Sequence, residues 1–221
     1  MRILSEDPLF QNLRRDMVQQ QLRQRGIRDE RVLSVMERLP RHLFADERYW
    51  REAYADCPVP IDNGQSISQP YMVALMLQAL CIESGSRVLE IGTGTGYQAA
   101  LLAELASEVI SVERLETLAD TARNNFSALG VENVEVVIGD GSIGYQPRAP
   151  YDRIIVAAAA PEVPSALKDQ LADRGLLLIP VGSSDVQVLN RITRIGTEFR
   201  TELQESCRFV PLIGKHGQRS E

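Results

Sequence analysis

The chain has 221 residues, of which 44% are hydrophobic and 24% charged, an ordinary composition for a globular protein with one substantial α/β domain. Its net charge of −6 argues against nucleic acid as a partner, because affinity for phosphate backbones comes largely from Lys and Arg. No apolar run of about 18 residues occurs, and the first residues lack the apolar core of a secretion signal. We therefore expect a cytoplasmic monomer with neither a nucleic-acid nor a membrane partner.

Cysteine and histidine residues are few and dispersed. Cys57, Cys81 and Cys207 form no C-x-x-C pair, so the sequence indicates neither a disulfide framework nor a metal site, and we expect buried thiols. The two histidines, His42 and His216, also lie far apart. The sequence therefore shows no local arrangement of a nucleophile beside a base.

The N-terminal part of the chain predicts two helices. Apolar residues recur at four-residue intervals from Leu9 and indicate an amphipathic helix that ends at Gly26. Asp29 suits the N-cap of a second helix, which Pro40 stops. We expect both helices to form a cap on a sheet, within a segment 1–82 that also carries the active-site residues.

Between residues 49 and 70 the pattern changes to loops. Residues 49–60 are rich in aromatic residues and proline, and a long loop of this kind inside a compact domain often has a functional role. The segment Gly64–Pro70 follows, and Pro70 suits the first turn of the next helix. Ser68 therefore lies just outside a helix N-terminus, where free N–H groups favour an anion. Plain helix capping by Ser68 or Gln69 explains the local sequence equally well.

A glycine-rich segment follows the first strand of the predicted sheet. Arg87–Tyr97 predicts a short strand, a loop with glycine at positions 92, 94 and 96, and the start of a helix. This arrangement opens a doubly wound nucleotide-binding fold, whose ligand lies at the carboxyl edge of the strands. A dinucleotide fingerprint would place its third glycine at Tyr97, and a P-loop would need a lysine, of which the nearest is Lys168. Glu113 ends the next strand at the spacing typical of a carboxylate that binds ribose hydroxyls, and a solvated strand end is the plain alternative.

The remaining elements predict a mostly parallel sheet that is covered on both faces. Strands are expected at 134–138, 151–156 and 176–179, with a helix from about Ser165 to Leu171. Asp140 stands between two glycines after the first of these strands, which suits either an adenine contact or a turn. Residues 186–195 and 199–212 predict a terminal antiparallel pair, and residues from Lys215 onward are expected to fray. In this single domain, the cofactor-binding core would span 83–182, and the terminal strands and tail 183–221.

Several segments together resemble a known family. The run Val88–Tyr97, with an acid two residues before its first glycine, is similar to motif I of class I S-adenosylmethionine-dependent methyltransferases. The resemblance to protein-L-isoaspartate O-methyltransferases, in their bacterial form, rests on further segments: Gly64-Gln65-Ser66-Ile67-Ser68-Gln69-Pro70, Gly139-Asp140-Gly141, Tyr151–Val156, Leu178–Gly182 and Phe209–Leu212. It covers about residues 10–213.

The resemblance implies a fold, an activity and a site. The fold would be α/β, with a doubly wound mostly parallel sheet, an N-terminal helical cap and a C-terminal antiparallel strand pair. A methyl group would pass from S-adenosylmethionine to the free α-carboxylate of L-isoaspartyl residues in damaged proteins and peptides. The ester would then close to a succinimide, whose hydrolysis restores part of the normal aspartyl linkage. Ser68 would be catalytic and would contact the substrate together with Val210, Pro211 and Leu212, without a metal. The cofactor-binding positions would be Gln65, Ser66, Ile67, Glu90, Gly92, Thr93, Gly94, Gly96, Glu113, Asp140 and Gly141.

One position departs from the family pattern, and other functions compete with it. Asp62 stands where the family usually has glycine; it tolerates positive φ better than most residues, but its charge would lie near an anionic substrate. A carboxylate, with a pKa of about 3.5 to 4, is ionised at neutral pH, so its methylation needs no general base. A small-molecule carboxyl methyltransferase is the closest alternative. An NAD-dependent oxidoreductase, or a module that binds the cofactor without turnover, are more distant ones.

Overall fold

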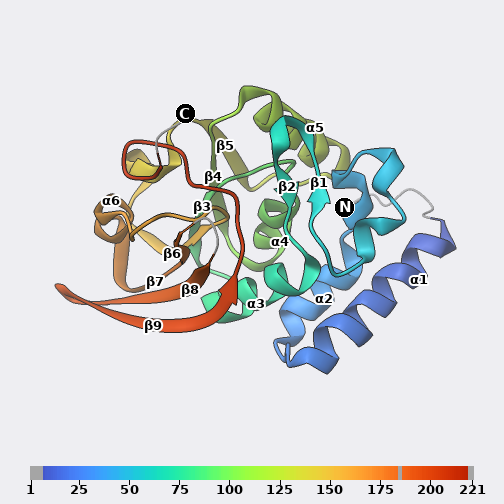
Figure 1. The fold of residues 1–221 in the computed structure, drawn as a ribbon, viewed down its shortest axis with the longest axis horizontal. Coiled ribbons are helices and arrows are strands. Elements are labelled where there is room, and N and C mark those ends of the chain that lie inside the picture. The colour runs from blue at the N-terminus through green and yellow to red at the C-terminus, as the bar shows by residue number, and fades with distance from the viewer. Residues whose placement is uncertain (1–6, 184–185, 219–221) are drawn as a thin grey trace.

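The computed structural model describes residues 7–183 and 186–218, and its centre is a seven-stranded sheet (Figure 1). The strand order is β5-β4-β3-β6-β7-β8-β9, in which the strands from β5 to β7 pair in parallel and β8 and β9 are antiparallel. This confirms the mostly parallel sheet with a terminal antiparallel pair, and it places β8 between β7 and β9. The bounds of these strands are β3 Arg87–Ile91, β4 Glu108–Glu113, β5 Val134–Ile138, β6 Tyr151–Val156, β7 Leu171–Gly182, β8 Gln187–Ile195 and β9 Glu198–Cys207.

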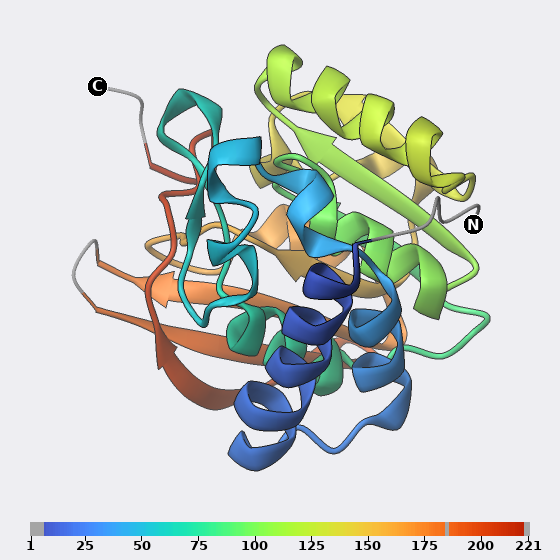
Figure 2. The same ribbon diagram turned by 90° about the vertical axis from the view of Figure 1, so that its right-hand side faces the viewer.

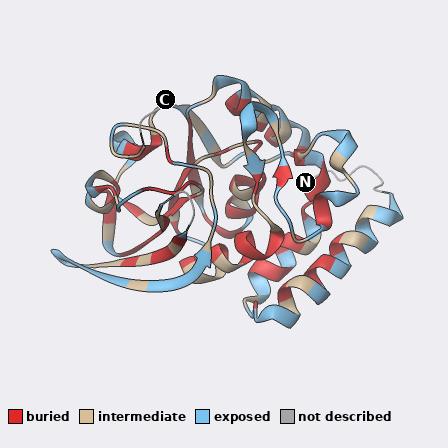
Figure 3. Ribbon diagram, in the orientation of Figure 1, coloured by how far each residue is buried: buried red, intermediate tan, exposed pale blue. Residues whose placement is uncertain are grey.

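Helices cover both faces of the sheet, so the fold is doubly wound. Successive strand residues point to opposite faces. Val88 of β3 lies on the face that is covered by α3, α4, α5 and the N-terminal helices. Leu89, the next residue, lies on the opposite face, which is covered by α6. Figure 3 shows the buried residues along the sheet and the exposed outer strand β9. Among the described helices, none is long and apolar enough to cross a membrane. The bounds are α3 Pro70–Leu80, α4 Tyr97–Leu105, α5 Glu116–Leu129 and α6 Ser165–Asp169.

The two predicted N-terminal helices are present. Helix α1 (Pro8–Asp16) continues through a π-helical turn (Met17–Leu22) and a short 3-10 turn to Gly26, which ends the segment with a φ of 96°. Helix α2 (Glu30–Arg38) begins at Asp29, whose carboxylate accepts hydrogen bonds from two main-chain N–H groups of the first turn. Figure 2 shows α1 and α2 side by side at one end of the molecule.

The aromatic segment before α3 folds into short 3-10 turns and a small two-stranded sheet. Strand β1 (Val59–Pro60) pairs antiparallel with β2 (Ser66–Ile67). Upstream, Trp50 packs edge-on against His42, which stacks on Phe10 with 4.1 Å between the ring centroids. These aromatic side chains thus help to pack the turns of this segment against α1.

Two predicted boundaries near the C-terminus are wrong. Helix α6 ends at Asp169, and β7 begins at Leu171 because that residue already pairs with Tyr151 across an irregularity in the register. Strand β9 ends at Cys207, whereas residues 209–212 leave the sheet edge. There the N–H of Ala159 donates to the Val210 carbonyl at 2.8 Å. This contact draws the segment to the carboxyl end of β6.

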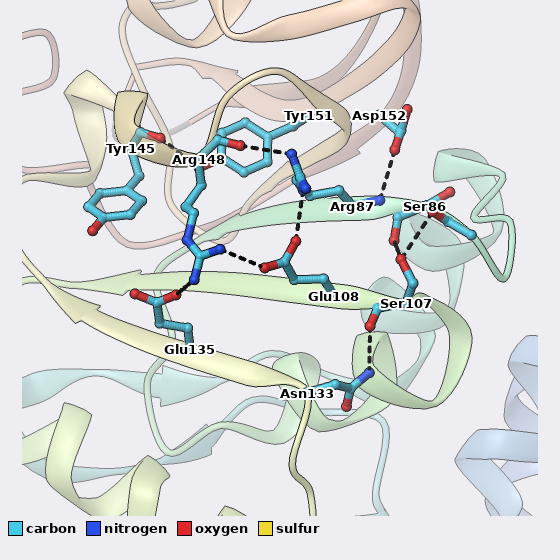
Figure 4. A network of polar contacts seen from close by, with 11 residues as sticks. Ser86, Arg87, Ser107, Glu108, Asn133, Glu135, Tyr145, Arg148, Tyr151 and Asp152 are labelled. Atoms are coloured by element: carbon cyan, nitrogen blue, oxygen red, sulfur yellow. Dashed lines mark hydrogen bonds and ion pairs between the residues drawn. The ribbon is translucent and has the colours of Figure 1, made fainter.

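A polar network joins the parallel strands near their amino ends (Figure 4). The Arg87 Nε donates to Glu108 Oε2 at 2.7 Å, and the Arg148 guanidinium donates to Glu135 at 2.8 Å. The Arg87 main-chain N–H donates to the Asp152 carboxylate at 2.8 Å. These contacts hold the edge of the sheet opposite to the one that carries the predicted site.

The cysteines are not buried, so that expectation is wrong. Cys57 and Cys81 are exposed, and Cys207 is half-buried. Cys81 ends α3 in the left-handed conformation, with a φ of 48°, at the surface where the chain turns towards β3. Its position follows from this turn, which hydrophobicity alone does not reveal.

Candidate active site

The loop after β3 turns sharply at the carboxyl edge of the sheet. Gly92, Gly94 and Gly96 have φ angles of 93°, 55° and 96°, a region that L side chains rarely adopt. A Cβ at Gly96 would also lie 2.7 Å from the Phe126 ring of α5. The glycines therefore allow both the turn and the close packing of α4 on α5, and they present bare main chain to a cavity that Gly92, Thr93 and Gly94 line.

Glu113 lies at the end of β4 and faces the same cavity. Its side chain is only 5% exposed, so it is not a solvated strand end. One carboxylate oxygen accepts from the Gly94 N–H at 2.9 Å, and the other accepts from Arg114 and Leu115 at 2.8 and 3.0 Å. The main chain thus holds the carboxylate in one orientation, and its remaining lone pairs can accept hydrogen bonds from hydroxyl groups of a ligand.

Glu90 is fully buried beneath the loop and does not line the cavity. Its carboxyl group accepts hydrogen bonds from Ser111 Oγ at 2.5 Å and Gln98 Nε2 at 3.0 Å. Burial raises the pKa of Glu90 to about 8, against the opposing effect of these two hydrogen bonds. Gln98, which donates to Glu90, does line the cavity.

One cavity brings together most of the residues that the sequence assigned to the cofactor. Of the predicted positions among the described residues, Glu90, Gly96 and Asp140 are absent from its lining. The cofactor positions in the lining are Gln65, Ser66 and Ile67 before α3, and Gly92, Thr93, Gly94, Glu113 and Gly141 at the sheet edge. The residues predicted to contact the substrate, Ser68, Val210, Pro211 and Leu212, line the same cavity.

Ser68 lies where this cavity meets a second cleft. The residue is half-buried at the junction between β2 and α3, and it lines both hollows. The N-cap of α3 is Gln69, which makes no side-chain capping bond. Within the described ranges the Ser68 hydroxyl makes no hydrogen bond either, so neither side chain caps the helix. The hydroxyl is therefore available to a ligand.

The second cleft is open and has one charged residue among the described residues that line it, Arg208. It extends from Ser68 along residues 206–211, which run from the last two residues of β9 into the segment that leaves the sheet edge. Ser66, Ala157, Val210 and Pro211 also line both this cleft and the cavity. An extended chain in the cleft could thus reach a ligand in the cavity only beside Ser68 and these neighbours.

Comparison with known proteins decides the family. The model of the protein-L-isoaspartate(D-aspartate) O-methyltransferase family matches residues 12–217. The chain belongs to this family. It is 55% identical to a protein-L-isoaspartate O-methyltransferase of Methanoregula boonei over 92% of this chain and 94% of that protein, and 53% identical to one of Methanoculleus marisnigri over 94% of both. A solved structure from Plasmodium falciparum, described as a protein of this family in complex with S-adenosyl-L-homocysteine, superposes with a TM-score of 0.77 at 27% identity, covering 92% of this chain and 98% of that one.

In this member of the family, Asp140 holds the C-terminal tail. Its carboxylate accepts from Ser142 N and Oγ at 2.9 and 2.7 Å and from the Lys215 N–H at 2.8 Å. The His216 N–H donates to Ser142 Oγ at 2.9 Å. The expectation that residues from Lys215 onward fray is therefore wrong up to residue 218; residues 219–221 lie outside the described ranges. The adenine contact of Asp140 stays a prediction, and Gly141 is the residue of this pair that lines the cavity.

Asp62 is tolerated at the position where the family usually has glycine, but for a different reason from the one predicted. The positive φ angles of this turn belong to Asn63 at 57° and Gly64 at 67°, so Asp62 needs no left-handed conformation. Asp62 is exposed and lines a separate hollow beside residues 43–49. Asp62 is not among the described residues that line the Ser68 cleft, so its charge does not face the expected anionic substrate there.

Several residues that line the site were not predicted from the sequence. Ala157 lines both hollows at the carboxyl end of β6, a position that the fold itself marks as ligand-facing. Leu115 and Leu118 line the cavity just after Glu113. Gln98 reaches the cavity from the first turn of α4. No motif identifies the last three, because their roles follow from how α4 and α5 pack at this edge.

Proposed function

We propose that the protein transfers the methyl group of S-adenosylmethionine to the free α-carboxylate of L-isoaspartyl residues in damaged proteins and peptides. The observation that carries this proposal is the position of Ser68, which lines both the cavity beside the glycine-rich loop and the second cleft along residues 206–211. Family membership supports the same reaction.

The residues of the cavity fit S-adenosylmethionine. The bare main chain of Gly92 and Gly94 admits the close approach of the amino-acid end, and Glu113 has lone pairs for the ribose hydroxyls. Leu115 and Leu118 offer an apolar surface to a purine ring. When bound, the cofactor would supply a methyl group on its sulfonium sulfur: an ionised carboxylate oxygen would bond to that methyl group in line as the carbon–sulfur bond breaks, and S-adenosylhomocysteine would leave, without a general base.

The protein's own contribution is alignment. Ser68 is proposed to donate a hydrogen bond to one oxygen of the substrate carboxylate and so to direct the group towards the cavity. A strong bond would also lower the nucleophilicity of that oxygen, so orientation must be the larger effect. The N-terminus of α3, directly after Gln69, favours a carboxylate at this place without protonating it. Val210 and Pro211, which line both hollows, are proposed to contact the peptide; Leu212, predicted for the same role, is buried and lines only the cavity.

The alternative functions have less support. A small-molecule carboxyl methyltransferase is not favoured, because the family model and both named relatives are described as protein-L-isoaspartate O-methyltransferases. An NAD-dependent oxidoreductase would need a glycine at Tyr97, which is instead a buried side chain at the start of α4. We further propose that the three predicted parts act as one unit, since each supplies residues to the cavity. Monomeric state, absence of nucleic acid and cytoplasmic location stay predictions.

The decisive experiment uses two synthetic peptides of identical sequence, one with an L-isoaspartyl and one with a normal aspartyl linkage. Each is offered with S-adenosylmethionine labelled in the methyl group. Only the isoaspartyl peptide should accept label. Equal labelling of both peptides, or of neither, would contradict the assignment, and labelling of free dicarboxylic acids instead would favour the small-molecule alternative.

A further inference from the structure

Arg41 is a buried cation that touches the active-site segment. It lies in a 3-10 turn (Arg41–Phe44) of the N-terminal cap and is 0% exposed. Its Nη2 donates to the carbonyl oxygen of Ser68 at 2.8 Å, and its Nε donates to the carbonyl oxygen of Ala53 at 2.7 Å. The guanidinium carbon lies 4.6 Å from the centre of the Tyr97 ring, at the start of α4. One side chain thus joins the cap, the Ser68 segment and the cofactor loop.

Arg41 gives two main-chain carbonyl groups a donor, but its own Nη1 is buried without a hydrogen-bond partner among the described residues. Within the described ranges Arg41 makes no ion pair with a carboxylate, and burial lowers the pKa of its guanidinium. Desolvation of an unpaired charge is costly, and apolar side chains often replace buried charges without loss of stability. A guanidinium nevertheless has one property that an apolar or ammonium group lacks, because its planar fork holds two acceptors at fixed directions.

The hydrogen bond from Arg41 to the Ser68 carbonyl is the contact that can hold Ser68 in position. Ser68 follows a two-residue strand and precedes α3, and its hydroxyl makes no hydrogen bond within the described ranges. The bond from Arg41 fixes the plane of the Ser68–Gln69 peptide, and with it the direction in which the Ser68 side chain leaves the main chain. Because Arg41 also lies against Tyr97, the same contact sets Ser68 relative to the loop at the cavity.

We propose that Arg41 is a positioning residue, which aligns Ser68 with the cofactor cavity through its carbonyl group. The proposal rests on the proposed function for its effect on turnover, but its effect on the segment itself does not depend on that function. It also predicts that Lys cannot replace Arg41, since one ammonium nitrogen cannot reproduce the fork.

The test compares Arg41→Lys with Arg14→Lys, a matched control in the same cap. Arg14 is also buried, at 6% exposure, and donates to a main-chain carbonyl, that of Glu37, away from the cavity. Arg41→Lys should lower kcat for the isoaspartyl peptide about tenfold or more, since small misplacements have costs up to about 10²-fold, and should leave the Kd for S-adenosylmethionine within about threefold. Arg14→Lys should leave kcat within about twofold of wild type at temperatures where it is folded.

A double-mutant cycle separates positioning from a general loss of structure. If Arg41 acts through Ser68, the double variant Arg41→Lys/Ser68→Ala should turn over within about threefold of Ser68→Ala alone. Multiplicative losses, or an Arg41→Lys variant with a lowered Tm and normal kcat, would overturn the proposal.

Hydrogen exchange provides a readout that needs no activity. In the wild-type protein, amides of residues 66–69 should exchange at least about tenfold more slowly than those of the exposed turn at residues 62–64, and Arg41→Lys but not Arg14→Lys should remove this protection. Rapid exchange in the wild type overturns the proposal even if the variant does not fold. A wild-type protein that methylates neither peptide would refute the proposed function, while hydrogen exchange would still decide the role of Arg41.

Discussion

Replacement of Glu113 by alanine tests the cofactor site most directly. The structure holds this carboxylate with three main-chain N–H groups, from Gly94, Arg114 and Leu115, and leaves lone pairs towards the cavity. Charge-assisted hydrogen bonds to ribose hydroxyls contribute about 1.5–3 kcal/mol. Their loss should therefore raise the Kd for S-adenosylmethionine about 10- to 150-fold. The upper part of this range is expected, because the Gly94 N–H also loses the partner that orients the loop.

Titration calorimetry with both S-adenosylmethionine and S-adenosylhomocysteine distinguishes the possible causes. The ribose is common to both, so the two ligands should lose the same factor; a loss confined to S-adenosylmethionine would indicate attraction to the sulfonium charge instead. Glu116→Ala is the matched control, since Glu116 is exposed in the first turn of α5 and its removal changes the net charge equally. If the Kd of Glu113→Ala for S-adenosylmethionine lies within about twofold of the Kd of this control, Glu113 does not bind the ribose. A loss of about 1.5 kcal/mol or more would change the Kd at least about tenfold.

Three further predictions follow from the same site. Ser68→Ala should lower turnover by about 10²-fold with little change in cofactor affinity, because alignment is lost; near-normal kcat with a lowered Tm would leave Ser68 a purely structural role. Gly96→Ala should cost about 1–3 kcal/mol more in unfolding free energy than Gly26→Ala, because both glycines have a φ of +96° but only Gly96 would contact Phe126; equal losses in urea titrations would contradict the packing argument. The pKa of Glu90, about 8 in the folded protein against an ordinary 4.5, means that the folded chain retains a proton that the unfolded chain has released. Its contribution to unfolding free energy should therefore fall between about pH 4.5 and 8, by up to about 1.4 kcal/mol per pH unit, and Glu90→Gln should remove this slope in melts at several pH values.

The parts of the site that sequence predicted are those in which a short segment imposes its own geometry. Alternate glycines after a β-prone run predict the sharp loop, because only glycine readily adopts the positive φ angles found at all three positions. Asp29 before an apolar periodicity predicts the start of α2, because its side chain satisfies N–H groups of the next turn. Glu113 was predictable because a strand of this length must end at the carboxyl edge of the sheet.

Contacts between distant segments were decided only by the tertiary structure. The bond from Arg41 to Ser68, the anchoring of Lys215 on Asp140, and the place of Val210 beside Ala159 each join residues whose neighbours in sequence carry no signal of the partner. Strand order and helix packing determine which main-chain groups are left without a local partner, and a buried donor or acceptor must then find one elsewhere. For this reason the sequence determined the glycine loop that lines the cavity, whereas packing determined which residues hold Ser68 and the C-terminal tail.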